Sequence, residues 1–278
     1  MSEKINITLG DVQKTLLLPL WGRADETQKE NPLLVDTTAV EIVHRINYDL
    51  STIARNMREI TRFAWIVRSL LMDRVVQQFL RAHPRGTVVN VGCGLDTTFD
   101  RIDNGLCTWY DLDLPDVIEL RRQFIRETER RKFISSSFLE DAWLNKLTIT
   151  DNVFFMAAGV LYYFEEQQIK QFFVKLAEMF PDSELLCDVS SPMGVRAANK
   201  MVITASGLDE RSFLKWGAKD PTEILRWDPR ITLVKKYAFF RGRKRYLRPK
   251  FWFAAIMVDL LKIQYLVHLK FSDNVPDA

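Results

Sequence analysis

The spacing of hydrophobic positions changes near residue 87. In residues 36–82 the apolar residues recur with the period of an α-helix, most clearly in a stripe from Phe63 to Phe79. Asp36 precedes the first periodic residues of this region, where its carboxylate can accept a hydrogen bond from the first turn of a helix. The pattern predicts a helical N-terminal region that ends at about residue 82.

From residue 87 onward, short apolar runs alternate with amphipathic segments. Five runs are predicted to be strands: TVVNV, LCTWYDLD, KFISSSF, NVFFMAA and ELLCDVSS. Helices are expected from Asp116 to about Arg131 and from Glu165 to about Phe180. Because parallel strands need crossover connections and are covered on both faces, this alternation predicts an α/β fold with a doubly wound, mostly parallel sheet.

The last third of the chain predicts two further features. ITLVKKYAFF and IQYLVHLKF have the character of strands and are expected to form an antiparallel pair at one sheet edge. Residues 190–225, which contain FLKWGAKD, are expected to form a lid over a ligand site. The predicted organisation is therefore a cap in residues 1–82 and a core in residues 83–278 with a lid insertion.

Charge and composition exclude several classes of protein. The chain has 39 basic and 36 acidic residues, a net charge of +3, which gives no global field for gathering nucleic acid. The basic run RGRKRYLRPKFWF, residues 241–253, could meet an acidic partner, a membrane surface or nucleic acid, but a solvated hairpin or loop is preferred to an RNA-binding surface. The apolar stretch 251–271 is interrupted by charged residues, which argues against a membrane span. No nucleic-acid partner and no span are expected.

The cysteines and histidines argue against metal and disulfide chemistry. The 3 cysteines have no CxxC spacing, and none of the 3 histidines has metal-ligand spacing to another histidine or to a cysteine. The N-terminus MSEKINITLGD lacks the apolar core of a signal peptide, so a cytoplasmic location is expected.

The run VVNVGCGLDTTFDR, residues 88–101, carries the main chemical signal. Gly92 and Gly94 follow the first predicted parallel strand, the position at which α/β sheets bind their ligands. Thr97 replaces the third glycine of a dinucleotide motif, and Asp96 would repel a pyrophosphate. Cys93 has no histidine or basic residue beside it in the sequence that would lower its pKa, which argues against a nucleophile.

A second signal is WYDLDLPDVIELRR, in which a strand ends in acids about 20 residues after the first glycine. A carboxylate there can accept hydrogen bonds from both ribose hydroxyls of an adenosine. Asp113 is preferred to Asp111 because it is nearer the end of the strand, although an acid that caps the next helix is an open alternative. An adenosine ligand without phosphate and with cationic groups suggests S-adenosylmethionine.

Several ordered motifs resemble the leucine carboxyl methyltransferase family of S-adenosylmethionine-dependent enzymes. They are PLWGRADE, VRSLLMD, the glycine run, WYDLDLPDVIELRR, SSFLEDAWL and AAGVLYYF, and the likeness covers roughly residues 15–270. The sequence looks closest to the bacterial branch that O-methylates polyketides and other carboxylic acids. The resemblance implies a Rossmann-like methyltransferase sheet with an N-terminal helical cap.

The resemblance also assigns roles to residues that match the family's motifs. Arg68 would bind the methionine carboxylate, Gly92 with Gly94 and Asp96 would form the floor under the cofactor, and Asp113 would bind the ribose. The pair that contacts adenine falls on Ser137 and Phe138. Ala158 stands where many members have an acid directed at the cofactor's amino group. Three alternatives are weaker cofactor binding, replacement of the acid by Asp96 or a backbone carbonyl, and a member that has drifted from catalysis.

The expected substrate is a small hydrophobic or polyketide-like carboxylic acid. A carboxylate is ionised at neutral pH and needs no general base, whereas a phenol usually requires one, and the sequence offers no persuasive histidine–acid pair. Arg23 is a candidate clamp for the substrate carboxylate and Tyr163 a candidate donor near the methyl group. Two alternatives are a binding or regulatory protein with weak catalysis and a methyltransferase that acts on a protein C-terminus. The oligomeric state stays open.

Overall fold

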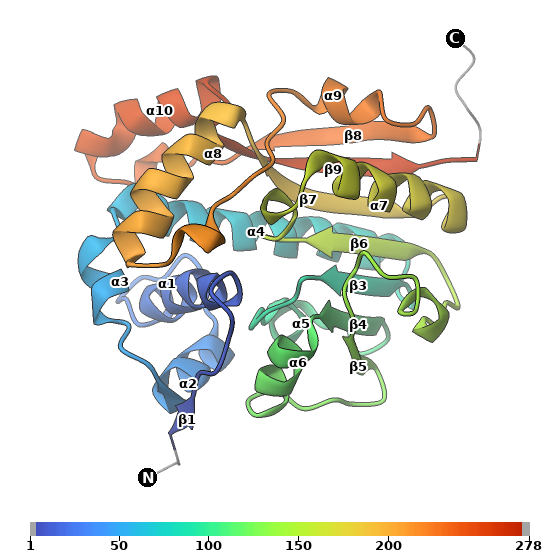
Figure 1. Cartoon of the computed structure of the whole chain (residues 1–278), viewed down its shortest axis with the longest axis horizontal. Helices are drawn as coiled ribbons and strands as arrows, with labels where there is room; N and C mark the ends of the chain where they lie inside the picture. Colours follow the sequence, from blue (N-terminus) through green and yellow to red (C-terminus); the bar gives the residue numbers. More distant parts are fainter. Residues whose placement is uncertain (1–3, 274–278) are drawn as a thin grey trace.

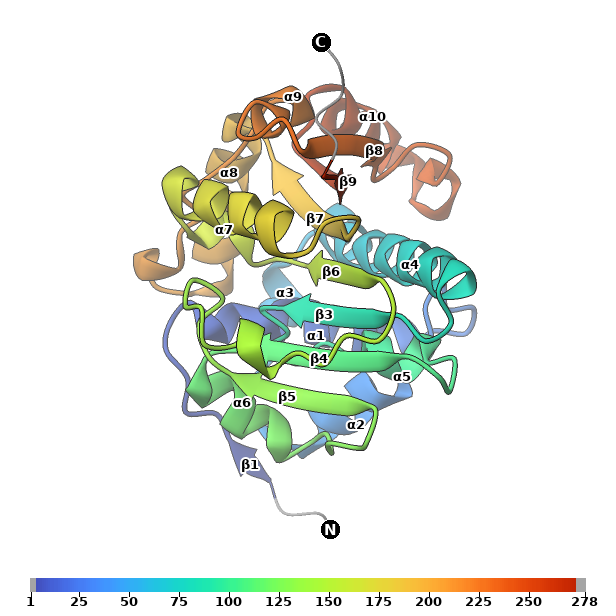
Figure 2. The ribbon, with the colours of Figure 1, turned by 90° about the vertical axis from the view of Figure 1, so that its right-hand side faces the viewer.

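A seven-stranded sheet forms the centre of the protein. The computed structural model describes residues 4–273, and within them all side chains except those of residues 52–54 and 244. Figure 2 shows the strands stacked in the order β5-β4-β3-β6-β7-β9-β8. In chain order they are β3 (Thr87–Val91), β4 (Thr108–Asp113), β5 (Arg131–Ser135), β6 (Val153–Ala157), β7 (Glu184–Ser190), β8 (Ile231–Ala238) and β9 (Gln264–Phe271).

The first five strands pair in parallel, and β9 runs antiparallel to both β7 and β8. This arrangement confirms the predicted fold class. All residues of β3 and β6 are buried, as expected of central parallel strands covered on both faces. Val91 pairs with Leu112 of β4 and with Ala157 of β6, so the three strands end at the same level.

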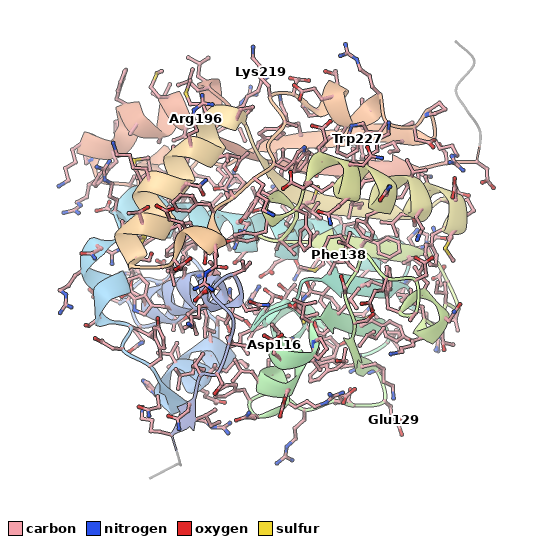
Figure 3. All side chains as sticks on the ribbon, in the orientation of Figure 1. Asp116, Glu129, Phe138, Arg196, Lys219 and Trp227 are labelled. Carbon is pink, nitrogen blue, oxygen red and sulfur yellow. The ribbon has the colours of Figure 1, made fainter. Side chains whose placement is uncertain are left out.

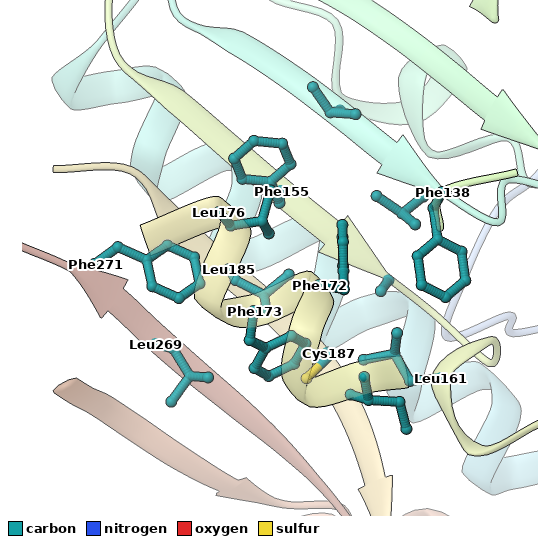
Figure 4. Close-up of a cluster of buried hydrophobic side chains, with 14 of the residues drawn as sticks. Phe138, Phe155, Leu161, Phe172, Phe173, Leu176, Leu185, Cys187, Leu269 and Phe271 are labelled. Atoms are coloured by element: carbon teal, nitrogen blue, oxygen red, sulfur yellow. The ribbon is translucent and has the colours of Figure 1, made fainter. Parts of the chain in front are cut away.

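Helix α7 (Glu166–Met179) covers one face of the sheet. Its Phe172, Phe173 and Leu176 pack in a buried cluster with Phe155 and Leu185 of the strands (Figure 4). The helix begins with a capping box in which Glu165 and Gln168 exchange hydrogen bonds with each other's backbone. The predicted helix from Glu165 to about Phe180 is therefore confirmed.

Helix α4 (Glu59–Ala82) covers the opposite face (Figure 2). Its Val67, Leu71 and Val75 share a cluster with Phe154 and Met156 of β6. The short α5 (Thr98–Ile102) also contributes to this cluster, as does Ala255 of α10 (Trp252–Leu260). The boundary expected at residue 82 thus separates α4 from the sheet that it covers, and the division into cap and core stays a prediction.

The remaining N-terminal elements lie beside the carboxyl ends of the strands (Figure 1). They are β1 (Ile5–Asn6), η1 (Gln13–Leu16), α1 (Leu17–Thr27), α2 (Thr37–Arg45), β2 (Ile46–Asn47) and α3 (Ser51–Asn56). Asp36 caps α2 as predicted, because its carboxylate accepts a hydrogen bond of 2.9 Å from the Ala39 amide. Leu17 and Leu20 of α1 pack with Cys93 and Leu95. The N-terminal helices therefore support the glycine loop directly.

The helix expected from Asp116 to about Arg131 is wrong in its length. Helix α6 (Pro115–Arg122) ends nine residues earlier, and Arg131 is already the first residue of β5. The sequence RETER, residues 126–130, offers no apolar face for a helix. Instead, the Glu127 carboxylate accepts a hydrogen bond of 2.7 Å from the Phe133 amide and ties the turn to β5.

The C-terminal third contains more helix than the sequence indicated. Residues 190–225 include α8 (Pro192–Ala198), η4 (Asn199–Ile203), η5 (Thr204–Ser206), η6 (Glu210–Ser212) and α9 (Pro221–Leu225). The run 241–253, expected as a hairpin or loop, forms η7 (Lys244–Tyr246) and η8 (Pro249–Phe251) and enters α10. Between residues 4 and 273, no helix is long and apolar enough to cross a membrane.

Candidate functional site

One cavity of about 350 Å³ lies at the carboxyl ends of β3, β4 and β6. The arrowheads of these strands point toward α1 and α8 in Figure 1, and both helices contribute to the lining. All ten site residues expected from the sequence line it, although they come from six separate segments: Arg23, Arg68, Gly92, Gly94, Asp96, Asp113, Ser137, Phe138, Ala158 and Tyr163. The fold therefore brings them to a single place.

The glycine loop is shaped by close packing of the chain. Gly92 and Gly94 have φ values of 64° and 49°, a region that favours glycine. A Cβ at Gly92 would lie 2.4 Å from Cγ2 of Val160, the residue that follows Gly159 at the end of β6. Gly92 is thus required by the approach of two loops to each other, a reason that the sequence alone did not indicate.

Asp113 ends β4 and holds the glycine loop. Its Oδ2 accepts a hydrogen bond of 2.7 Å from the Gly94 amide, and its Oδ1 accepts one of 2.8 Å from the Leu114 amide. Burial raises the pKa of this carboxyl to about 6, although both hydrogen bonds act to lower it. Each oxygen keeps a second lone pair for a ligand. Among the described residues no side chain caps α6, so the capping alternative for Asp113 is not what the structure contains.

Asp111, the acid rejected as the ribose ligand, has a different role. It is fully buried, and it accepts hydrogen bonds from Arg121 at 2.8 Å, Arg131 at 2.9 Å, Trp109 at 3.0 Å and Asn90 at 3.2 Å. Its carboxylate therefore bonds to four donors within the protein and does not line the cavity.

Asp96 is ionised and fixed at the start of α5. Its Oδ2 accepts a hydrogen bond of 2.8 Å from the Thr98 amide. Burial opposes ionisation, but Arg101 and Arg23 outweigh this effect and hold the pKa of Asp96 at about 2. The site therefore contains a permanent negative charge beside the loop.

Arg23 is held in a buried network that the sequence did not predict. Its Nε donates to Oδ2 of Asp36 over 2.8 Å, its Nη2 donates to the Leu95 carbonyl over 2.9 Å, and the residue is only 4% exposed. Nη1 of Arg101 donates to the same carboxylate oxygen over 2.8 Å. The guanidinium thus joins the N-terminal helices to the loop, and its expected role as a substrate clamp stays a prediction.

Arg68 is also paired, with an acid that sequence reasoning missed. Its Nη1 donates to Oδ2 of Asp188 over 2.8 Å and to the Tyr162 hydroxyl over 3.3 Å. Asp188 is fully buried near the end of β7, and its Oδ1 accepts from the Gly159 amide at 2.6 Å. Burial would lower the pKa of Arg68, but the charge of Asp188 raises it. Nη1 makes both bonds, and within residues 4–273 no hydrogen bond occupies Nε or Nη2, which leaves these nitrogens for a ligand carboxylate.

The sequence did contain a signal for Asp188. ELLCDVSS was predicted to be a buried strand, and an acid near the end of such a strand requires either a partner or a function. What the sequence could not show is that its partner lies on a helix 120 positions earlier.

Phe138 and Ser137 form the rim of the cavity on the side of β5. The Phe138 ring is buried and packs edge-on against Phe164 and Phe172, with centroids 4.7 Å and 4.8 Å away (Figure 4). The Ser137 hydroxyl accepts a hydrogen bond of 3.2 Å from the Leu139 amide. These contacts fix one aromatic edge and one polar group at the rim.

Tyr163 lies in η3 (Leu161–Tyr163), directly after β6. Burial raises the pKa of its hydroxyl to about 12. A hydrogen bond with the Thr15 side chain, which also lines the cavity, acts to lower this pKa, but the hydroxyl stays protonated at neutral pH.

The segment expected as a lid does line the cavity. It contributes mainly apolar side chains: Ala197, Ala198, Met201, Val202, Ile203 and Leu214. Arg196, also on α8, is exposed at the outside of the molecule (Figure 3). The side of the cavity formed by this segment is therefore suited to an apolar ligand.

The chemical groups that line the cavity match those of S-adenosylmethionine. Asp113 offers acceptors for ribose hydroxyls, and Arg68 offers two nitrogens to a carboxylate. Leu112, Met156 and Phe138 provide apolar surface between these charges. The thiol of Cys93 is buried and its pKa is raised by that burial, which agrees with its exclusion as a nucleophile.

Comparison with known proteins gives a consistent result. The sequence profile described as leucine carboxyl methyltransferase matches residues 17–177. The tetracenomycin polyketide synthesis O-methyltransferase TcmP of Streptomyces glaucescens is 30% identical over 229 residues, 81% of each chain. The S-adenosyl-L-methionine-dependent methyltransferase dpfgK of Gibberella zeae is 28% identical over 195 residues, 65% of each chain.

Solved structures share the architecture at low sequence identity. A DUF574 family protein from Streptomyces avermitilis superposes with a TM-score of 0.59 at 11% identity, over 92% of this chain and 97% of that one. An O-methyltransferase family protein from Burkholderia thailandensis has a TM-score of 0.50 at 16% identity, over 94% of this chain and 70% of that one. These likenesses show the fold.

Proposed function

Because the chain belongs to the leucine carboxyl methyltransferase family of S-adenosylmethionine-dependent enzymes, we propose that it methylates a carboxylate oxygen of a small hydrophobic acid. The name of the Streptomyces relative refers to polyketide synthesis, so polyketide-like acids are the first substrates to test.

The observation that carries this proposal is the set of ionisable groups in the cavity lining. Among the described residues that line it, none is a histidine, a lysine or a glutamate. His83 pairs with Asp151 and His268 with Glu184, both outside the lining, and His44 is exposed. A carboxylate needs no base to become a nucleophile, whereas a phenol with a pKa of about 10 usually does. Asp96 and Asp113 are the acids of this lining, and both are proposed to contact the cofactor, so the lack of a histidine, lysine or glutamate beside them favours an acid as substrate.

The proposed cofactor contacts follow from the geometry. Asp113 would accept hydrogen bonds from the ribose hydroxyls, Arg68 would bind the methionine carboxylate, and Ser137 with Phe138 would border the adenine. When bound, S-adenosylmethionine supplies a methyl group on a sulfonium, which is a good leaving group. The protein has to orient the acid and exclude water.

Ala158 cannot supply the charge that an acid would have at its position. Asp96 is the proposed replacement, because it lines the same cavity and its pKa of about 2 keeps it ionised. The neutral Tyr163 hydroxyl is proposed to orient the substrate carboxylate by donating a hydrogen bond. Arg23 is proposed to act through the loop that it holds and not through the substrate.

A binding measurement and a turnover assay test the proposal in sequence. Calorimetric titration with S-adenosylhomocysteine should give saturable heat in the wild type and much weaker binding in Asp113→Asn. Methyl release is then measured with aromatic and aliphatic acids, matched phenols and a peptide that carries a free C-terminus.

We expect turnover with one or more of the small acids. Binding without turnover on any acid would favour a regulatory protein, and turnover on the peptide alone would favour a protein carboxyl methyltransferase. Methylation of phenols with none of the acids would contradict the proposed substrate class.

A further inference from the structure

Helix α10 exposes an apolar stripe. Phe253, Ile256 and Leu260 are 74%, 48% and 69% exposed, and their spacing of three and four residues places them on one side of the helix. Leu261, directly after the helix, is 40% exposed. The opposite side carries Ala255, which is fully buried, and Val258, which packs against the core. The helix is therefore anchored to the protein on one side and apolar on its outer side.

A strongly basic segment leads into this helix. Residues 241–250 contain no acid, and their basic residues are Arg241, Arg243, Lys244, Arg245, Arg248 and Lys250. Of these, Arg241, Arg245, Arg248 and Lys250 are exposed. The chain as a whole carries a net charge of only +3, so positive charge is concentrated beside the stripe.

The acids near the stripe neutralise this segment only in part. Asp259 is the only acid within α10, and both of its carboxylate oxygens accept from the Phe240 amide at 3.1 Å. Burial raises the pKa of Asp259. Glu59 is occupied by an ion pair with Arg248. Arg241, Arg245 and Lys250 are exposed and thus leave positive charge on the segment that leads into this helix.

We propose that α10 and the basic segment 241–250 form a surface that binds anionic lipid membranes. An apolar helix face bordered by arginine and lysine lies in the plane of a membrane interface, with its apolar side among the acyl chains and its cations at the level of the phosphates. This surface binds a membrane from one side and crosses no bilayer.

A second copy of the chain fits the same surface less well. Two-fold symmetry would bring the two α10 stripes together and place both basic segments in one interface. With Asp259 and Glu59 already occupied, the like charges would face each other without compensation. An anionic lipid surface supplies the missing negative charge.

The surface also adjoins the candidate site. Val258 of α10 and Phe240, which precedes the basic segment, both line the cavity. A hydrophobic acid dissolved in a membrane would therefore reach the cavity beside the docked helix. Entry of the acid from the membrane rests on the proposed function. Membrane binding itself is measured without substrate or cofactor, so an experiment can contradict one and leave the other standing.

Flotation of the full-length protein with vesicles tests the inference. The vesicles contain phosphatidylcholine alone or with about 30% phosphatidylglycerol, a level that gives a negative surface potential. We expect binding to the anionic vesicles that weakens as sodium chloride rises from about 0.1 to about 0.5 M, where charges are screened within a few ångströms.

Two variants separate the contributions of the surface. Phe253→Ser/Leu260→Ser should lower the bound fraction on anionic vesicles at least tenfold, and Arg245→Gln/Lys250→Gln should remove most of the salt dependence. The matched control is Leu106→Ser, which removes a leucine that is 48% exposed in a different part of the chain. Thermal unfolding temperatures of all three should match the wild type, since the altered side chains are exposed.

The inference is overturned if the wild type does not float with anionic vesicles, or if the stripe variant floats as well as Leu106→Ser. Equal binding to neutral vesicles would remove the role of the basic segment. A wild-type dimer in light scattering that becomes monomeric in the stripe variant, without vesicle binding, would assign the surface to a second copy.

Discussion

Arg68 and Asp188 lie 120 positions apart in the chain, and Nη1 of Arg68 donates to Oδ2 of Asp188 over 2.8 Å. The pair connects the helix on one face of the sheet with the strand β7. Asp188 also accepts from the amide of Gly159, the residue after Ala158. One buried carboxylate therefore orients both the proposed carboxylate-binding arginine and the loop after β6.

Asp188→Asn should lower the free energy of unfolding by about 3 kcal/mol, because the buried Arg68 would lose its counter-charge while an amide oxygen still bonds Gly159. Urea unfolding measures this loss. Asp209→Asn is the control, because it removes an exposed partner of Arg211 and should leave the midpoint unchanged. An Asp188→Asn variant as stable as the control would contradict the central role of the pair.

Affinity for S-adenosylhomocysteine should depend on pH through Asp113. Its pKa of about 6 means that the carboxylate gains a proton as pH falls through 6 and becomes a weaker acceptor for the ribose hydroxyls. The dissociation constant should therefore be lowest above pH 7 and rise toward pH 5, as measured by calorimetry.

Asp113→Asn serves as the reference for that titration. At pH 7.5 it should bind more weakly by about 1.5 to 3 kcal/mol, the scale of hydrogen bonds to a charged group, and show no step near pH 6. A wild-type affinity that is constant between pH 5 and 8 would remove Asp113 from the proposed contact.

Arg23→Lys should lower the free energy of unfolding without changing KM for the acid. An ammonium cannot keep both the bond to Asp36 and the bond to the Leu95 carbonyl in the geometry of a guanidinium, so a loss of about 1 to 2 kcal/mol is expected. Urea unfolding and KM for the acid are the two measurements. An increase in KM with full stability would instead support the substrate clamp expected from the sequence.

Tyr163→Phe should raise KM for the acid at least about tenfold, the effect of losing one hydrogen bond to a charged carboxylate, about 1.5 to 3 kcal/mol. The hydroxyl has a pKa of about 12, so it acts as a donor and the rate should show no new ionisation between pH 7 and 9. Tyr48→Phe, at a position 38% exposed, is the control. An unchanged KM would show that the Tyr163 hydroxyl does not contact the substrate.

The sequence determined the fold class because each element carries its own periodic pattern. The buried runs of β3 and β6, the capping box of α7 and the alternating residues of β9 are local features, and local features can be read along the chain. The pattern failed after Arg122, where α6 ends and the charged run of residues 126–130 offers no apolar face to extend it. It failed again at residues 241–253, which enter a helix.

Tertiary structure decided which charged groups are available to a ligand. Arg23 and Arg68 both stand in motifs, and only the folded chain pairs one with Asp36 and the other with Asp188. Tertiary structure also gives the two acids of β4 different surroundings. Asp113 lines the cavity, whereas Asp111 is paired with two buried arginines. A residue type in a motif specifies what chemistry is possible, but the free energy of a buried charge depends on partners that are distant in sequence. For this reason the sequence predicted residues that line the cavity, and only the three-dimensional structure showed which of their charged groups are paired within the protein.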